Sequence, residues 1–172
     1  MKNLWAPWRM DYIREEGGKG CIFCRNAKVK KDKETLILYR GRSAFVIMNK
    51  FPYNSGHVMV VPKRHCVDLS ELGSGEALEL FRLLRASTEV LKNTLRPCGF
   101  NIGINLGKAG GAGMAHLHIH VVPRWTGDTN FMPVLSETRV MPEYLYQTYE
   151  KLSESFQEVR NRRRRKKGGG NR

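Results

Sequence analysis

Three histidines alternate with apolar residues in the run His-Leu-His-Ile-His-Val at positions 116–121, and this run constrains the fold more than any other part of the sequence. Strict alternation is the period of a β-strand, in which successive side chains point to opposite faces of a sheet. The pattern predicts a strand over residues 116–123 that buries its apolar side chains. His116, His118 and His120 would then form a row on the other face, about 6.6–7 Å apart.

The residues alone leave three interpretations of this row open: a catalytic row, a bare metal site, or a half-buried strand that uses histidine as its polar residue. The segment before it, Asn-Leu-Gly-Lys-Ala-Gly-Gly-Ala-Gly at positions 105–113, favours chemistry on phosphates. Glycine lets backbone N–H groups approach an anion without obstruction by a Cβ atom. A flexible hairpin connection is the plainer alternative for this loop.

The remaining hydrophobic pattern predicts a small sheet with helices beside it. Four more β-rich runs are expected, at residues 36–39, 44–48, 57–62 and 100–105. A helical period begins at Ser74, the expected N-cap, and stops before Pro97. A second helix is expected from Pro142 to about Val159. Because hairpins join most of the strands, we expect an α+β fold, an antiparallel sheet of about five strands with one central and one C-terminal helix.

The net charge of +14 is concentrated at the C-terminus. Residues 160–172 hold eight basic residues and no acidic one, which leaves 22 basic and 16 acidic residues, or +6, in the rest of the chain. We therefore expect one catalytic domain over 1–159 and a basic, disordered tail over 160–172. The tail is either a solubilising end or a sequence-independent contact with nucleic acid.

The sequence contains no stretch near the roughly 20 apolar residues that a membrane-spanning helix needs. The first residues also lack the apolar core of a signal peptide. We therefore expect no membrane contact and a cytoplasmic location. In that compartment the pair Cys21 and Cys24, at C-x-x-C spacing, indicates metal or redox chemistry before it indicates a crosslink. An empty C-x-x-C pair remains the alternative.

The residues 116–122 resemble the signature of the histidine triad family of nucleotide hydrolases and transferases. The resemblance continues through the segments 49–57 and 62–65 and covers roughly residues 20 to 130. Within the family, the segments 4–9 (Leu-Trp-Ala-Pro-Trp-Arg) and 123–131 (Pro-Arg-Trp-Thr-Gly-Asp-Thr-Asn-Phe) resemble the bacterial branch that has diadenosine tetraphosphate phosphorylase activity.

The resemblance implies roles for individual residues. His118 matches the family's nucleophile, and a neutral imidazole suits this role because its ordinary pKa is about 6.5. Attack on the α-phosphorus of a nucleotide would give a nucleotidyl-histidine, which water or inorganic phosphate then resolves. His120 matches the histidine that contacts the reacting phosphate and assists the leaving oxygen, and His57 matches the upstream histidine that completes the cluster.

The same comparison implies a substrate-binding set. Asn49 matches the position that reaches the ribose, and Asn105 matches the amide that contacts the phosphates. Gly111 and Gly113 belong to the phosphate-binding loop, although relatives often carry Ser or Thr at position 113. For Trp125, a substrate or dimer contact and simple core packing both remain open.

Zinc-containing relatives use two cysteines, a downstream histidine and the first histidine of the motif, which here are Cys21, Cys24, His65 and His116. Two cysteines and two histidines make a closed tetrahedral site, so the expected Zn²⁺ is structural. The residues require no metal for the chemical step, and Mg²⁺ is considered only as a companion of the polyphosphate.

The expected function is therefore nucleotidyl transfer from a dinucleoside polyphosphate, such as diadenosine tetraphosphate, to phosphate, by a homodimer. Two alternatives stay open. One is a hydrolase of dinucleoside polyphosphates, nucleoside phosphoramidates or aminoacyl adenylates. The other is an inactive, basic nucleic-acid-binding module that kept the fold.

Overall fold

The computed structural model describes residues 20–128 and 143–168, with side chains as far as residue 161. Several parts of the sequence interpretation lie outside these residues. They are the opening segment 4–9, the last three residues of the segment 123–131, the expected helix start at Pro142, and the last four residues of the tail. The division into a domain over 1–159 and a tail over 160–172 stays a prediction.

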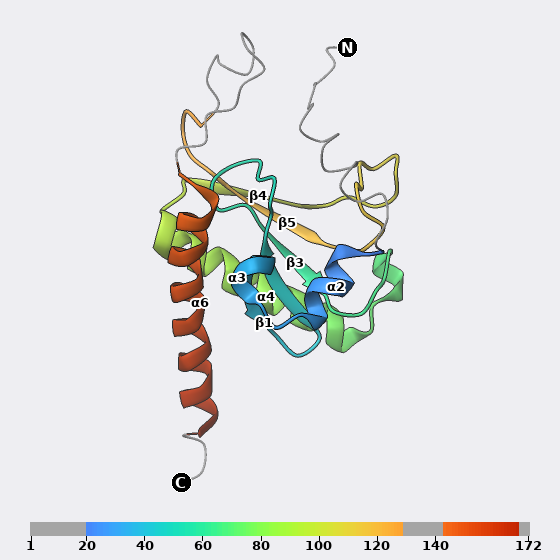
Figure 1. The fold of residues 1–172 in the computed structure, drawn as a ribbon, viewed down its shortest axis with the longest axis horizontal. Coiled ribbons are helices and arrows are strands. Elements are labelled where there is room, and N and C mark those ends of the chain that lie inside the picture. The colour runs from blue at the N-terminus through green and yellow to red at the C-terminus, as the bar shows by residue number, and fades with distance from the viewer. Residues whose placement is uncertain (1–19, 129–142, 169–172) are drawn as a thin grey trace.

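One antiparallel sheet of five strands forms the centre of the described structure. The strands are β1 (Ile37–Arg40), β2 (Ala44–Met48), β3 (Val58–Pro62), β4 (Gly99–Ile104) and β5 (Ile119–Arg124). Their order across the sheet is β1-β2-β3-β5-β4, so β5 lies between β3 and β4 (Figure 1). The expected α+β class and the five strands are confirmed.

The helices are α2 (Ile22–Lys28), α3 (Asp32–Thr35), η1 (Leu69–Glu71, a 3₁₀ turn), α4 (Ser74–Leu95) and α6 (Leu145–Gly168). α4 packs on β2, β3 and β5, and α6 packs on β1 and α4. Both central strands, β2 and β3, are buried along their whole length, which explains why they are continuous apolar runs rather than alternating ones. In the described parts of the chain, no helix has both the length and the apolar character needed to cross a bilayer.

The boundaries of the two long helices differ from the expected ones. Ser74 is the first helical residue and Gly73 is the N-cap, whose N–H donates to the Glu76 carboxylate at 3.1 Å. A glutamate at this position fills the role expected of a serine cap. α6 continues to Gly168 instead of ending near Val159, and it extends beyond the sheet (Figure 1). Arginine and lysine are good helix formers, so a basic run does not by itself end a helix.

The expected strand over 116–123 is wrong at its start, because β5 begins only at Ile119. The partner strand β3 ends at Pro62, which has no N–H to extend the ladder. The backbone before β5 bonds elsewhere instead, since Leu117 N–H donates to the Cys66 carbonyl at 2.7 Å. Of the three alternating histidines, only His120 lies on the strand.

The turn between β1 and β2 is held by a carboxylate from α4. Glu79 accepts hydrogen bonds from the backbone N–H groups of Arg42 and Ser43, both at 2.6 Å, and from the Ser43 hydroxyl. Burial raises the pKa of Glu79, but these hydrogen bonds outweigh burial and hold the pKa below its ordinary value. The ionised carboxylate therefore stabilises the folded state.

We expect Glu79→Gln to lower the free energy of unfolding by about 1–2 kcal/mol at pH 7, because an amide turns one N–H group toward backbone donors. The stabilisation is present above the ordinary glutamate pKa of about 4.3 and disappears as the pH falls through the lower folded-state pKa. Urea unfolding of both proteins at pH 7 and in acid measures this difference. A difference that stays constant into acid would contradict the assigned role of the carboxylate.

Candidate active site

Three imidazole rings from two distant segments meet beside β5. His118 and His120 have ring centroids 4.7 Å apart, and His57 and His120 have centroids 5.1 Å apart. His57 directly precedes β3, and β3 pairs with β5, so the sheet itself brings these segments together. The rings are closer than two-residue spacing along a strand predicts, because they do not project in parallel from one strand.

His118 presents one nitrogen as a base. Its Nδ1 lies 2.7 Å from the backbone carbonyl of His116, which can only accept, so Nδ1 carries the hydrogen. In the neutral ring Nε2 then keeps its lone pair. Burial lowers the pKa of His118, against the opposing effect of the His116 hydrogen bond. His118 is therefore a neutral imidazole at pH 7 with a nucleophilic Nε2.

His57 and His120 have the opposite arrangement. The backbone N–H of Tyr53 donates to His57 Nδ1 at 3.1 Å, so this nitrogen carries no hydrogen. His57 Nε2 then carries it and donates to His120 Nδ1 at 2.9 Å. Because Nδ1 of His120 accepts, its own hydrogen lies on Nε2. The cluster therefore places a proton donor, His120, against the ring that carries the lone pair, His118.

The two expected amide residues lie in loops, Asn49 beside His57 and Asn105 directly after β4. The Asn49 amide nitrogen is 3.4 Å from His57 Nδ1, and its carbonyl accepts from the Phe51 N–H at 3.0 Å. Asn105 begins the glycine loop and reaches across it to the Gly111 carbonyl at 3.5 Å. The structure thus brings Asn49 next to His57, and Asn105 across the loop from Gly111.

The glycine loop is folded back on itself by backbone hydrogen bonds. The Gly111 N–H donates to the Lys108 carbonyl at 3.0 Å, and the Ala112 N–H donates to the Gly107 carbonyl at 3.1 Å. Gly107 and Gly111 have φ angles of 66° and 81°, which require glycine. These two hydrogen bonds close turns within the loop. Gly113 is exposed at its end.

Four potential metal ligands lie together, namely Cys21, Cys24, His65 and His116, with all ligand atoms within 4.8 Å of one another. Cys21 Sγ is 3.1 Å and Cys24 Sγ is 3.6 Å from His116 Nδ1, and Cys24 Sγ is 3.4 Å from His65 Nδ1. In a tetrahedral zinc site with ordinary bond lengths, sulfur and nitrogen ligands are about 3.5 Å apart. The four residues therefore fit a tetrahedral ion.

The protonation of the ligands also fits a cation. His116 Nε2 lies 3.0 Å from the Pro62 carbonyl and must donate to it, so the lone pair is on Nδ1, the atom next to the thiols. Burial first, and then the neighbouring Cys21, raise the pKa of the Cys24 thiol. Two thiolates at this spacing repel each other, and a divalent cation between them removes that cost.

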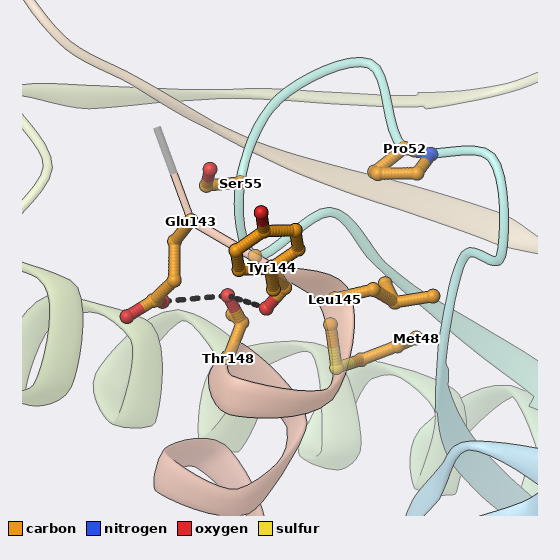
Figure 2. Close-up of a pocket in the computed structure, with 8 residues that line it drawn as sticks. Met48, Pro52, Ser55, Glu143, Tyr144, Leu145 and Thr148 are labelled. Atoms are coloured by element: carbon orange, nitrogen blue, oxygen red, sulfur yellow. Dashed lines mark hydrogen bonds between the residues drawn. The ribbon is translucent and has the colours of Figure 1, made fainter. Parts of the chain in front are cut away.

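A pocket of about 550 Å³ lies between the loop 52–56 and the start of α6 (Figure 2). Its lining residues are Met48, Pro52, Ser55, Gly56, Glu143, Tyr144, Leu145 and Thr148. The Glu143 carboxylate accepts from the Thr148 hydroxyl at 2.6 Å and from Lys151. None of the predicted site residues lines this pocket.

The sequence interpretation missed three features of the site. It did not find the Tyr53 N–H that sets the His57 tautomer, nor Phe23, whose ring lies 5.2 Å from that of His118. It also missed an ion pair at the end of β5 between Arg124 and Asp128. The i,i+4 spacing of opposite charges signals that pair, although the segment was used only for its family resemblance. Trp125, within the same turn, is half-buried, and its role stays a prediction.

The HIT-domain family model matches residues 30–127, more than half of the chain. The chain is 38% identical over 162 residues to a Mycobacterium tuberculosis protein named AP-4-A phosphorylase, covering 89% of this chain and 83% of the relative. It is 32% identical over 92 residues to a Schizosaccharomyces pombe asymmetrical bis(5'-nucleosyl)-tetraphosphatase, covering 54% of this chain and 50% of that relative.

Solved structures agree with these relatives. A Zn-bound histidine triad family protein from Mycobacterium smegmatis superposes with a TM-score of 0.66 at 27% identity, covering 83% of this chain and 96% of the other. The resemblance inferred from the residues 116–122 is therefore confirmed. By its sequence match, its sheet and its cluster of imidazoles, the chain belongs to the histidine triad (HIT) family.

Proposed function

We propose that this chain transfers a nucleotidyl group from a dinucleoside polyphosphate, such as diadenosine tetraphosphate, to inorganic phosphate through nucleotidyl-His118. The observation that carries the proposal is the pairing of opposite tautomers, with a lone pair on His118 Nε2 and a hydrogen on His120 Nε2. A nucleophile beside a hydrogen-bond donor suits a displacement at phosphorus, because the donor can stabilise the charge that develops on the leaving oxygen. The 38% identical relative named AP-4-A phosphorylase supports the choice of substrate and acceptor.

The first step forms a bond between His118 Nε2 and the α-phosphorus and breaks the bond from that phosphorus to the bridging oxygen. The electron pair of the broken bond leaves with the polyphosphate oxygen, and His120 Nε2–H donates a hydrogen bond that stabilises the charge on this oxygen. In the second step an oxygen of inorganic phosphate attacks the same phosphorus. The phosphorus–nitrogen bond breaks, its electron pair returns to His118, and the proton of the attacking phosphate is released to water.

Substrate contacts are proposed for the residues that surround these rings. Asn49 binds the ribose, while Asn105, Gly111 and Gly113 bind phosphate oxygens through an amide and through backbone N–H groups. Gly113 supplies no hydroxyl, so this loop binds phosphate with fewer side-chain contacts. Trp125 is proposed as a contact to substrate or to a second subunit. Mg²⁺ is proposed only as a companion of the polyphosphate and has no assigned ligands.

We also propose that Cys21, Cys24, His65 and His116 hold a structural Zn²⁺, as supported by their spacing and by the Zn-bound relative. The ion would supply positive charge to two thiolates and fix the His116 ring. Because the carbonyl of His116 accepts from His118 Nδ1, fixing this residue also steadies the nucleophile. All four ligand positions are occupied by protein, so the ion takes no part in the chemical step.

A homodimer and a cytoplasmic location complete the proposal. β4 is the last strand in the sheet order, and Ile102 at its middle is about half exposed. An edge strand of this kind favours pairing with a second copy of itself. The four cysteines among the described residues are free thiols, which suits a reducing compartment.

Hydrolysis is the second candidate, because the Schizosaccharomyces pombe relative is named a tetraphosphatase. In that case water, instead of phosphate, takes the nucleotide from His118. Incubation with diadenosine tetraphosphate, with and without phosphate, separates the two. ATP plus ADP that forms only with phosphate supports the proposal, whereas ATP plus AMP, or two ADP, supports a hydrolase. Absence of any product would overturn both and favour a nucleic-acid-binding role for the basic C-terminus.

Replacement of the nucleophile tests the covalent route. We expect His118→Asn to lower kcat by at least about 10³-fold, because the amide of asparagine cannot form the bond to phosphorus that the imidazole forms. Thermal unfolding and nucleotide affinity should change little. A variant that retains a tenth of wild-type turnover would exclude the covalent mechanism.

Replacement of a metal ligand distinguishes a structural role of the proposed zinc site from a catalytic role. The purified protein should contain about one zinc per chain, and Cys24→Ser should lose it and melt at a lower temperature, because binding free energy contributes to folding free energy. Cys98→Ser is the matched control, since Cys98 is an exposed thiol outside the cluster. Elemental analysis and calorimetry measure both effects. Zinc-free wild-type protein, or loss of activity at unchanged melting temperature, would contradict the structural role.

A further inference from the structure

Asp128, in the turn after β5, accepts four hydrogen bonds from residues that the structure describes. Arg124 donates to both of its oxygens, from Nε at 2.6 Å and from a terminal nitrogen at 2.8 Å. The Asn54 amide donates at 2.6 Å and the Trp125 N–H at 3.2 Å. The hydrogen bonds from Arg124 hold the pKa of Asp128 well below its ordinary value, so the carboxylate is ionised throughout the neutral range.

Hydrogen bonds to the Asp128 carboxylate and its partners connect β5, β4 and the loop before β3. Arg124 lies at the end of β5 and also donates to the Asn101 side chain on β4, at 2.6 Å. Asn54 belongs to the loop before β3 and is buried, and its amide also donates to the Pro123 carbonyl at 3.1 Å. The loop that carries Asn54 is therefore fastened to the end of β5 through Asp128.

That same loop sets the protonation of the catalytic histidines. The Asn54 carbonyl accepts from the His57 N–H at 3.1 Å, and the preceding residue, Tyr53, donates its backbone N–H to His57 Nδ1. Gly56 has a φ of 75°, a conformation that favours glycine at this position of the turn. Among the contacts of the described residues, the Asn54 side chain links this turn to Asp128.

Resting on the function proposed above, we propose that Asp128, through Asn54, is a positioning residue that holds the Tyr53 N–H on His57. The hydrogen on His57 Nε2 then keeps His120 in the tautomer that donates a hydrogen bond to the leaving oxygen. If the Tyr53 N–H moves away, His57 can carry its hydrogen on Nδ1 instead. His120 would then donate from Nδ1 to His57, and its Nε2 would have only a lone pair to offer the leaving group.

The first test reads the tautomers directly. Long-range ¹H–¹⁵N NMR of the histidine rings should find hydrogen on Nε2 of both His57 and His120 in the wild-type protein, and mixed tautomers in Asp128→Asn. Asp32→Asn is the matched control, because Asp32 accepts from Arg40 in a similar ion pair beside β1. Wild-type tautomers in a folded Asp128→Asn variant would overturn the proposal.

The second test measures the rate of the first turnover. Because a hydrogen bond from His120 strengthens as charge develops on the leaving oxygen, Asp128→Asn should slow the release of ATP from diadenosine tetraphosphate by about 10²-fold. KM should stay within about threefold of wild type, since no substrate contact is proposed for Asp128. An unchanged rate of ATP release in a folded variant would overturn the proposal.

A second variant keeps the test decisive if Asp128→Asn does not fold. Asn54→Ala removes the same hydrogen bond from the other side and should give the same tautomer change and the same slower release of ATP. Failure of Asn54→Ala to change the tautomers also overturns the proposal. Because the NMR measurement uses no substrate, its result stands even if the protein proves inactive on dinucleoside polyphosphates.

Discussion

The hydrogen bond from His118 Nδ1 to the carbonyl of His116 is the interaction on which the rest of the site depends. It fixes which nitrogen of His118 carries the lone pair, and it comes from a residue whose own side chain lies in the Cys/His cluster. This bond exists because β3 stops at Pro62, so the residues before β5 leave the sheet ladder. The carbonyl of Pro62 then accepts from His116 Nε2, so one strand end orients the histidine ring that lies in the Cys/His cluster.

Backbone groups thus determine which ring nitrogen of each of these histidines carries the hydrogen. Carbonyl groups place hydrogens on His116 Nε2 and His118 Nδ1, whereas the N–H of Tyr53 excludes a hydrogen from His57 Nδ1. The tautomers of these histidines are therefore fixed by backbone carbonyl and N–H groups, which do not titrate. Burial adds to this control because it keeps His118 neutral, and a neutral ring is the nucleophilic form.

Much of the fold and of the candidate site could be predicted from local sequence patterns, and the errors of that prediction share one cause. Five strands, the helix α4 and the grouping of Cys21 with His116 follow from periodicity and from family resemblance, even though Cys21 precedes the segment 30–127 that the family model matches. The alternation of histidine and apolar residues at 116–121 does not show where the strand begins. An extended segment outside a sheet has the same two-residue period. The start of β5 is decided by Pro62, 54 residues away along the chain from His116. The role of Asp128 depends in the same way on Asn54, which is remote in sequence.

The most direct test of the central claim is to trap the covalent intermediate. The enzyme is mixed with diadenosine tetraphosphate without phosphate, quenched within the first turnovers, and analysed by intact mass and peptide mapping. The account predicts one adenylyl group per chain, joined to His118 by an acid-labile bond, and its release as ADP when phosphate is added before the quench. An enzyme that turns over the substrate with no adduct at any quench time, or with the adduct on another residue, would contradict it.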